Sequence, residues 1–356
     1  MKKIVPICAA VAAAAMMLSI STSAMAMGGP SGPHVTYPVQ GNIGEVIVNP
    51  YKVAPLTAVI RDAGYDLSDV TVRIVPKTNG QEITYKVSRT ELKTHAGIPV
   101  FGLYPDYVNT VEVSYTRTDL KGEQKKISES YQIYAPPVYT EGNGTVSQKS
   151  TMFDTKVVKM DGEFKDRLYL VNNLLVSPPK GSRVVWNNPS GGALEWCFYP
   201  QNAIIDATGA VRWYMNVDSI YDMENVYHGG VMMGFQQGAD GALTWGYGQR
   251  YVKYDIMGRE IFNRRLPAGY ADFSHSFDQA QNGNYLLRVA ANDVKRPDGR
   301  NVRTVRDVIV EVTPAGRVVD DWRLWEILDP YRDNVIKTLD PVSYTHLRAH
   351  ETDQYL

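Results

Sequence analysis

The residue whose type and setting best suit chemistry is His275, in the run Ser274-His275-Ser276-Phe277-Asp278. Its imidazole can donate a hydrogen bond to an anion or transfer a proton near neutral pH. Asp278 either orients that imidazole or caps a turn. Arg288, on the following predicted strand, either binds an anion or pairs between neighbouring sheets, and we expect the pairing. A lone histidine is more often structural than catalytic, so the position of His275 in the fold must decide its role.

Other patterns that carry chemistry give no support for a cofactor or a metal. Neither a G-x-x-x-x-G-K-[ST] loop nor a strand-borne G-x-G-x-x-G loop occurs, so a nucleotide donor is unsupported. Cys197 lacks the C-x-P-x-R pattern that yields a formylglycine nucleophile, and we expect a small buried hydrophobe there. His346 and His350 are spaced i, i+4 but have no third ligand, so we expect no metal site.

The remaining histidines are expected to be structural. His228, in Tyr227-His228-Gly229-Gly230, precedes a predicted inner strand, and we interpret it as a loop residue. His34 falls in the leader segment and His95 in the N-terminal domain, and we expect both at the surface. His275 is therefore the candidate catalytic residue of the printed sequence.

A repeat specifies the elements that must position His275. Hairpin sequences recur around Gly209, Gly258 and Gly316, about 50 to 60 residues apart, each with an apolar strand on both sides of a tight turn. Inner hairpins are predicted at 239–242 and 281–284, and two hairpins per period are typical of a four-stranded propeller blade. His275 then lies at a loop-to-inner-strand junction, beside the central channel where such folds bind ligands.

Upstream of the repeat the pattern changes to that of a β-sandwich. Six runs alternate with period two between turn signals: Glu45 to Val48, Val70 to Val75, Glu82 to Ser88, Pro99 to Tyr104, Thr110 to Tyr115 and Ile127 to Tyr134. We predict an all-β chain with an N-terminal β-sandwich followed by an incomplete β-propeller of about three blades, because a propeller must close to protect its edges. The predicted segments are a signal peptide at 1–26, the sandwich at 36–135, a linker at 136–150, the partial propeller at 151–341 and a non-native tail at 342–356.

Composition and charge exclude some classes of partner. The 37 basic and 38 acidic residues give a net charge of -1, which offers no footprint for nucleic acid or an anionic membrane. Lys2 and Lys3 precede an apolar run that ends near Ala24-Met25-Ala26, a pattern typical of a cleavable export signal. We therefore expect a periplasmic protein. Of the 2 cysteines, only Cys197 lies outside that signal, so no internal disulfide is expected in these residues.

Several co-linear segments resemble the bacterial arylsulfate sulfotransferases that work without a phosphoadenosine donor. The similarity runs from about Gly41 to Pro341 and is carried by segments 41–51, 54–58, 98–104, 166–172, 255–258, 306–322 and 327–330. The resemblance implies a periplasmic homodimer with a six-bladed propeller. It also implies ping-pong transfer of a sulfuryl group from a phenolic sulfate ester to a phenolic acceptor, through a sulfohistidine and without a cofactor.

His275 matches the family's first active-site histidine, in the stretch Gly269-Tyr270-Ala271-Asp272-Phe273-Ser274-His275. The resemblance gives it a supporting role, as a donor to a sulfuryl oxygen or an acid that eases phenolate departure. The family's nucleophilic histidine comes later, past Pro341, so we expect this chain alone to be inactive. The alternative from another class is a non-catalytic periplasmic propeller that binds an aromatic or anionic ligand.

Overall fold

The computed structural model describes residues 43–142, 145–149, 152–153, 155–175, 199–216, 219–220, 232–292 and 307–327. Their regular structure is almost entirely β-strand, with short helices at α2 (Arg89–His95) and α3 (Leu324–Ile327). Within these residues no helix is long and apolar enough to cross a membrane. The predicted all-β class is confirmed.

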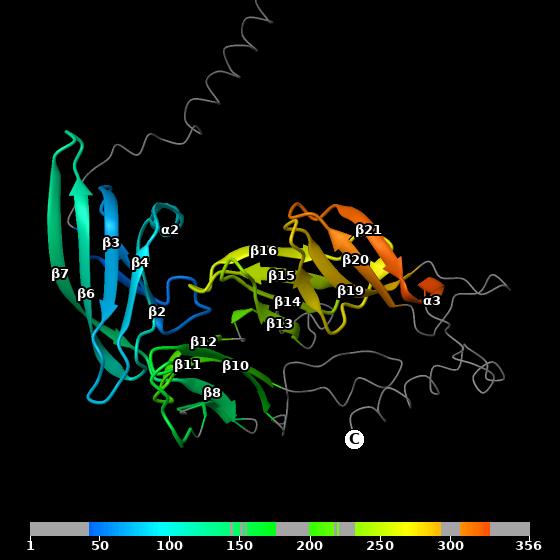
Figure 1. The fold of residues 1–356 in the computed structure, drawn as a ribbon, viewed down its shortest axis with the longest axis horizontal. Coiled ribbons are helices and arrows are strands. Elements are labelled where there is room, and N and C mark those ends of the chain that lie inside the picture. The colour runs from blue at the N-terminus through cyan, green and yellow to red at the C-terminus, as the bar shows by residue number, and fades with distance from the viewer. Residues whose placement is uncertain are drawn as a thin grey trace, which may run out of the picture.

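The N-terminal domain is a sandwich of two antiparallel sheets, which stands at one end of the molecule (Figure 1). The smaller sheet has the order β1-β2-β5, with bounds Val46–Val48, Thr57–Arg61 and Gly97–Phe101. The larger has the order β4-β3-β6-β7, with bounds Ile83–Val87, Asp66–Ile74, Tyr107–Thr118 and Gln124–Ala135. Alternate residues of β3 and β6, such as Val72 and Val113, face the core because successive side chains of a strand point to opposite faces. All six predicted runs lie on strands.

Two elements of the sandwich were not predicted. Strand β2 is a continuous run of mostly buried residues, so it lacks the alternation that marks the other strands. Helix α2 starts at a capping box, in which Ser88 Oγ accepts from the Glu91 N–H and the Glu91 carboxylate accepts from the Ser88 N–H. The spacing Ser88-x-x-Glu91 was the sequence signal for this helix.

Three larger antiparallel sheets follow along the molecule (Figure 1), and we name them the first, second and third blades. The first blade contains β10 (Leu168–Leu175), β11 (Tyr199–Asp206) and β12 (Val211–Tyr214). The second contains β13 (Met233–Gln237), β14 (Leu243–Tyr247), β15 (Arg250–Tyr254) and β16 (Glu260–Arg265). The third contains β17 (Tyr270–Ala271), β18 (Phe277–Gln279), β19 (Tyr285–Ala291), β20 (Asp307–Val312) and β21 (Val318–Arg323). This succession of sheets is the arrangement expected of propeller blades.

The three repeated hairpins share one turn geometry. The turn glycines Gly209, Gly258 and Gly316 have φ of 86°, 87° and 85°, in the region that favours glycine. The residue that opens each turn uses a side-chain oxygen to accept the N–H four residues later, and these residues are Asp206, Asp255 and Thr313. The three predicted hairpins with glycine turns are therefore confirmed, and the structure adds a shared side-chain hydrogen bond in each turn.

The interval predicted as a linker contains regular structure. Strands β8 (Tyr139–Gly142) and β9 (Thr145–Lys149) pair antiparallel within 136–150. The Asn143-Gly144 pair between them is a hairpin signal in the sequence, and the assignment of 136–150 as a linker stays a prediction. The predicted boundaries at 26, 36, 150 and 341, and the tail at 342–356, lie outside the described residues and stay predictions.

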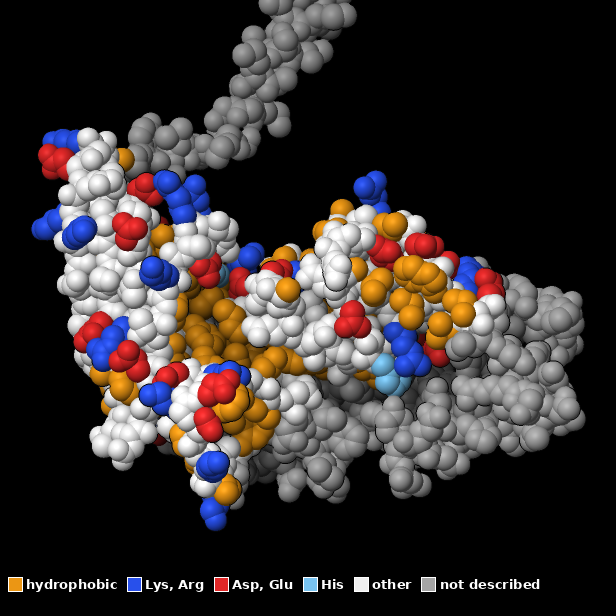
Figure 2. All heavy atoms as spheres, viewed as in Figure 1, with side chains coloured by type: hydrophobic (Ala, Val, Ile, Leu, Met, Phe, Trp, Pro, Cys, Tyr) orange, Lys and Arg blue, Asp and Glu red, His pale blue; other side chains and the backbone are white. Residues whose placement is uncertain are grey.

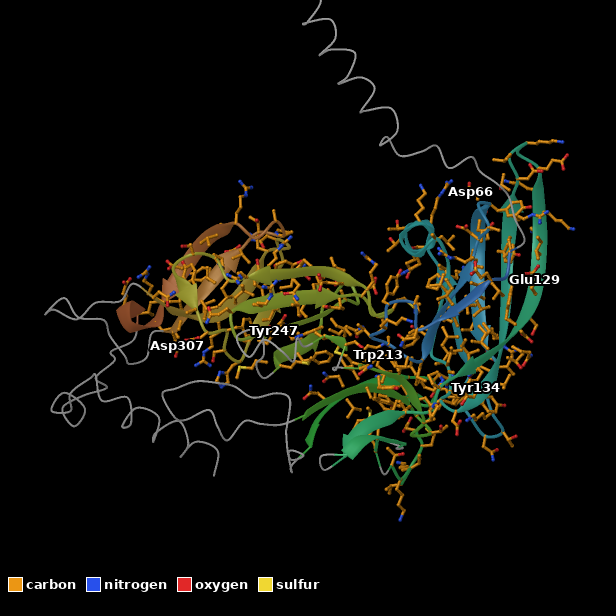
Figure 3. The ribbon with its side chains drawn as sticks, turned by 180° about the vertical axis from the view of Figure 1, so that it is seen from behind. Asp66, Glu129, Tyr134, Trp213, Tyr247 and Asp307 are labelled. Atoms are coloured by element: carbon orange, nitrogen blue, oxygen red, sulfur yellow. The ribbon has the colours of Figure 1, made fainter. Side chains whose placement is uncertain are left out.

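The sandwich packs on the first two blades through an apolar interface, which we call the joint and which includes Val53, Trp213 and Ile256. Hydrophobic side chains gather in the hollow between the sandwich and the blades (Figure 2). Trp213 lies at this joint (Figure 3), is fully buried, and donates its indole N–H to the carbonyl oxygen of Ile256 at 2.8 Å. Val53 belongs to the same buried cluster as Trp213, and its carbonyl accepts from the Asn216 N–H at 2.7 Å. Each domain therefore covers apolar surface of the other.

His95 lies in this joint, which corrects the expectation that it is a surface residue. Its side chain is 5% exposed, Nδ1 is 2.7 Å from the Tyr51 hydroxyl, and Nε2 is 4.0 Å from Asp255 Oδ2 in the second blade. Burial lowers the pKa of His95, and Asp255 opposes that effect in part. The local sequence around His95 contains no sign of a domain packed against it.

Candidate functional site

The inner edge of the third blade is an interrupted strand. Strands β17 and β18 both pair with β19, in the registers Ala271↔Ala290 and Phe277↔Leu287. Residues 272–276 therefore lie opposite 288–289 alone, so the chain bulges out of the sheet between the two short strands. His275 lies in that bulge.

The backbone at His275 is strained. Its φ is 60°, and the Ser276 N–H donates to the Ser274 carbonyl across it at 2.7 Å. A three-residue ring with positive φ at its centre is the rarer and more strained form of γ-turn. Such a conformation costs on the order of 1–3 kcal/mol and persists only where surrounding contacts enforce it.

Neighbouring strands supply those contacts. On one side, the Ser274 N–H donates to the Arg288 carbonyl at 2.9 Å, and the Arg288 N–H donates to the Ser276 carbonyl at 3.2 Å. On the other side, the Phe273 N–H donates to the carbonyl of Gly248, which follows β14, at 2.8 Å. The buried Phe273 ring lies against Gly246, where an added Cβ would overlap the ring. Two blades therefore hold the γ-turn.

The imidazole of His275 is presented at the surface and has a defined orientation. The residue is exposed, and Ser274 Oγ hydrogen bonds with His275 Nδ1. The His275 N–H faces Met233 Sδ of the second blade at 3.5 Å. A hydroxyl bonded to one ring nitrogen fixes the plane of the ring and directs Nε2 away from that hydroxyl. The arrangement suits an imidazole that meets a ligand from outside the sheet.

Arg288 lies on β19, and its backbone N–H and carbonyl hydrogen bond with the two residues that flank His275. Arg288 Nη2 is 3.4 Å from Asp307 Oδ2 on β20, so the ion pair lies within one blade and the expected pairing between blades is wrong. The side chain is 31% exposed. Its Nε is buried and has no hydrogen-bond partner within the part of the chain that the structure describes. The guanidinium therefore keeps a donor that its ion pair does not use.

Asp278, on β18, stabilises the turn through hydrogen bonds of its carboxylate. Its Oδ1 accepts from Gln236 Nε2 of the second blade and its Oδ2 from Ser276 Oγ, both at 3.2 Å. The carboxylate thus links the residue after His275 to the neighbouring blade. Ser274, Phe273 and Gly246 were not predicted as parts of the site, because nothing in the local sequence marks a non-glycine γ-turn.

The remaining candidate side chains lie outside the described residues: His34, Cys197, His228, His346 and His350. Among the described residues no group of three or more His, Cys, Asp or Glu side chains is arranged to hold a metal ion.

Comparison with known proteins shows which family this chain resembles. Residues 45–136 match the arylsulfotransferase Ig-like domain, and residues 154–354 match the arylsulfotransferase (ASST) family. Arylsulfate sulfotransferase AssT of Lelliottia amnigena is 35% identical over 317 residues, covering 84% of this chain and 52% of that protein. The protein of the same name from Escherichia coli O6:H1 is 36% identical over 320 residues, covering 85% of this chain and 52% of that protein.

The chain thus spans about half the length of the curated relatives it matches. A solved structure of virginiamycin B lyase from Staphylococcus aureus aligns with 81% of this chain and 71% of its own, at 12% identity and a TM-score of 0.23. A likeness at that TM-score supports no statement about this protein. The matches of both domains and the identity to the curated relatives do: the chain belongs to the arylsulfotransferase family.

Proposed function

We propose that the protein transfers a sulfuryl group from a phenolic sulfate ester to a phenolic acceptor. Family membership and the names of the relatives support this activity. The observation on this chain that carries the proposal is His275, an oriented imidazole on a strained γ-turn that two blades hold in place. Strain of this kind clusters at functional sites.

The chemistry proceeds in two displacements. In the first, a nucleophilic imidazole nitrogen forms a bond to sulfur, the sulfur–oxygen bond of the ester breaks, and a phenolate leaves. In the second, the oxygen of an acceptor phenol attacks the sulfohistidine and loses its proton, which releases the new ester and the free imidazole. Positioning and charge stabilisation dominate such transfers, as they do in phosphoryl transfer.

His275 is the supporting group in this scheme. Its imidazole donates to a sulfuryl oxygen as negative charge develops, or gives a proton to the departing phenolate. Arg288, whose partly exposed guanidinium lies on the strand beside the turn, binds a sulfate oxygen. The family resemblance assigns the nucleophile to a histidine past Pro341, so we propose that residues 1–356 alone support no turnover.

The test is His275→Asn in the full-length protein, assayed with 4-nitrophenyl sulfate and phenol. Asparagine tolerates positive φ, so this variant removes the imidazole and keeps the turn. Loss of one transition-state donor lowers kcat by about 100- to 1000-fold. Gln281→Asn, in the exposed turn after β18, is the matched control and retains wild-type kcat.

Turnover of His275→Asn within a fewfold of wild type would show that His275 is structural. Saturable binding of 4-nitrophenyl sulfate without any turnover by the wild-type full-length protein would instead favour the non-catalytic propeller. Turnover is followed directly by the release of 4-nitrophenolate, and binding without turnover is measured separately by calorimetry.

We also propose that residues 1–26 are removed during export to the periplasm and that the mature protein is a homodimer. The charged start, the apolar run and the Ala24-Met25-Ala26 site support export. Mass spectrometry of the secreted protein tests the cleavage, and light scattering of the purified full-length protein tests the dimer. An uncleaved N-terminus or a monomeric mass would refute the respective proposal.

A further inference from the structure

A cavity lies between the sandwich and the first blade, away from His275. Its volume is about 560 Å³, within the range of small-molecule sites. The sandwich contributes segments 77–80 and 104–106, and the first blade contributes segment 208–211. Tyr134, labelled in Figure 3, marks this end of the sandwich and donates its hydroxyl to Asp106 at 3.0 Å. A molecule bound here would touch both domains.

Apolar and aromatic groups form much of the lining. Tyr104, Pro105, Pro137, Val138 and Phe153 all contribute to it. The Tyr104 ring is fixed, because the residue is 2% exposed and its hydroxyl donates to the Gln81 carbonyl at 3.1 Å. The buried ring supports the lining from behind, and the partly exposed Pro105 and Phe153 present the apolar surface that suits a flat ligand.

Two cations contact the Tyr104 ring. Arg212 Cζ is 3.8 Å from the ring centroid and Lys77 Nζ is 4.9 Å from it. Arg212 is neutralised by Asp206, at 2.8 Å, and both side chains are fully buried. Lys77 Nζ also lies 4.2 Å from the Tyr107 ring centroid, and within the described residues no carboxylate lies within 4.0 Å of it. Lys77 therefore brings to the cavity a positive charge that has no ion-pair partner within the described residues.

The environment of Lys77 differs from that of the other lysine held against a ring. Lys253 Nζ lies 5.3 Å from the Tyr285 ring centroid but is paired with Asp240 at 2.6 Å. Burial, with the like charge of Arg212, lowers the pKa of Lys77, and Asp106 offsets this only in part. An anion beside the ammonium would remove that penalty.

We propose that this cavity binds a small aromatic monoanion, with its charged group on Lys77 and its ring against Pro105 and Phe153. The ammonium of Lys77 favours a single negative charge, and Asp106, which also lines the cavity, disfavours a dianion. The apolar lining selects an aromatic body over a bare inorganic ion. Because the ligand spans the sandwich and the first blade, its binding stabilises the contact between them.

The test measures binding of benzoate, phenol and acetate to the purified 356-residue chain carrying His275→Asn, by calorimetry at low ionic strength. The His275→Asn substitution removes the imidazole proposed for sulfuryl transfer, so any binding that is measured does not depend on that imidazole. Benzoate binds saturably, whereas phenol lacks the charge and acetate lacks the ring, and both bind more weakly. Benzoate raises the melting temperature, since it binds the folded chain.

Lys77→Met keeps the apolar stem and weakens benzoate binding about fivefold, which corresponds to roughly 1 kcal/mol at 25 °C. Lys77→Arg retains the charge and restores binding, which separates a lost ion contact from a general disturbance of the fold. Lys121→Met, in the exposed turn between β6 and β7, is the control and leaves the affinity unchanged.

The proposal is overturned if benzoate shows no saturable binding, if phenol binds as tightly as benzoate, or if Lys77→Met binds benzoate as well as the parent does. None of these results bears on sulfuryl transfer at His275. Conversely, a lack of sulfuryl transfer by the full-length protein would not contradict benzoate binding at Lys77.

Discussion

Arg212 offers the sharpest test of how the two domains are joined. Its side chain is fully buried, and it donates from Nε to the Gly102 carbonyl at 2.9 Å and from Nη1 to the Gln81 carbonyl at 2.8 Å. Nη1 also pairs with Asp206 Oδ2 at 2.8 Å. Arg212→Met fills similar space but removes the donor to the buried Asp206 carboxylate and to the Gly102 carbonyl, whereas the Gln81 carbonyl keeps the Tyr104 hydroxyl.

Removing one partner of a buried ion pair costs about 3–5 kcal/mol. Domains of ordinary stability unfold with a free energy of only about 5–15 kcal/mol, so the loss is a large fraction of the total. The matched control is Arg89→Met, because Arg89 pairs with Asp66 at a similar 2.8 Å while both side chains are more than half exposed. Exposed pairs contribute about 0–1 kcal/mol, so the control changes little.

Urea unfolding of the 356-residue chain, followed by circular dichroism and by tryptophan fluorescence, measures the effect. Asp206→Asn combined with Arg212→Met removes the buried charge, and an asparagine oxygen can still accept the Thr208 and Ala210 N–H groups that Asp206 binds. The double variant recovers about 1–2 kcal/mol relative to Arg212→Met. A loss below about 1 kcal/mol in Arg212→Met, or no recovery in the double variant, would refute this account of the joint.

Two further perturbations address the site and the pH dependence. Gly246→Ala makes a methyl group overlap the Phe273 ring and lowers the free energy of unfolding by about 1–3 kcal/mol. Gly162→Ala has open space around the added methyl group and leaves the free energy of unfolding unchanged. The urea midpoints of the two variants measure this difference. His95 has a lowered pKa in the folded chain, so the unfolded chain takes up its proton first as the pH falls below about 6.5, and stability falls with it. His95→Gln makes the loss between pH 7.5 and pH 5.5 smaller, and equal losses in both proteins would contradict the assignment.

The hairpin repeat could be predicted because every part of it is local. An acid or hydroxyl residue opens each turn, a glycine follows three residues later, and the closing hydrogen bonds join residues within the same five-residue segment. Strand alternation in β3 and β6 is likewise a property of consecutive residues. Patterns of this kind predicted the fold class and the order of the sheets.

Arg212 and His95 show where local pattern fails. Arg212 sits mid-strand between buried residues, where alternation cannot distinguish a packed arginine from an exposed one. Its partners at Gly102 and Gln81 lie more than 100 positions earlier in the chain. His95 ends a short helix, and its contact with Asp255 comes from another domain. Burial of charged or titratable groups at a domain joint depends on packing that no nearby residue encodes.

The geometry of His275 follows the same logic. A histidine with φ of 60° costs more than glycine would there, so the backbone conformation at this position runs against the local preference of the residue. The opposing contacts come from Met233 and Gly248 in the second blade and Arg288 in the third. A third blade without the second would lose the Phe273 and Met233 anchors and relax the γ-turn. The candidate site is therefore a property of two adjacent blades, and residues 270–278 specify the imidazole without specifying where it points.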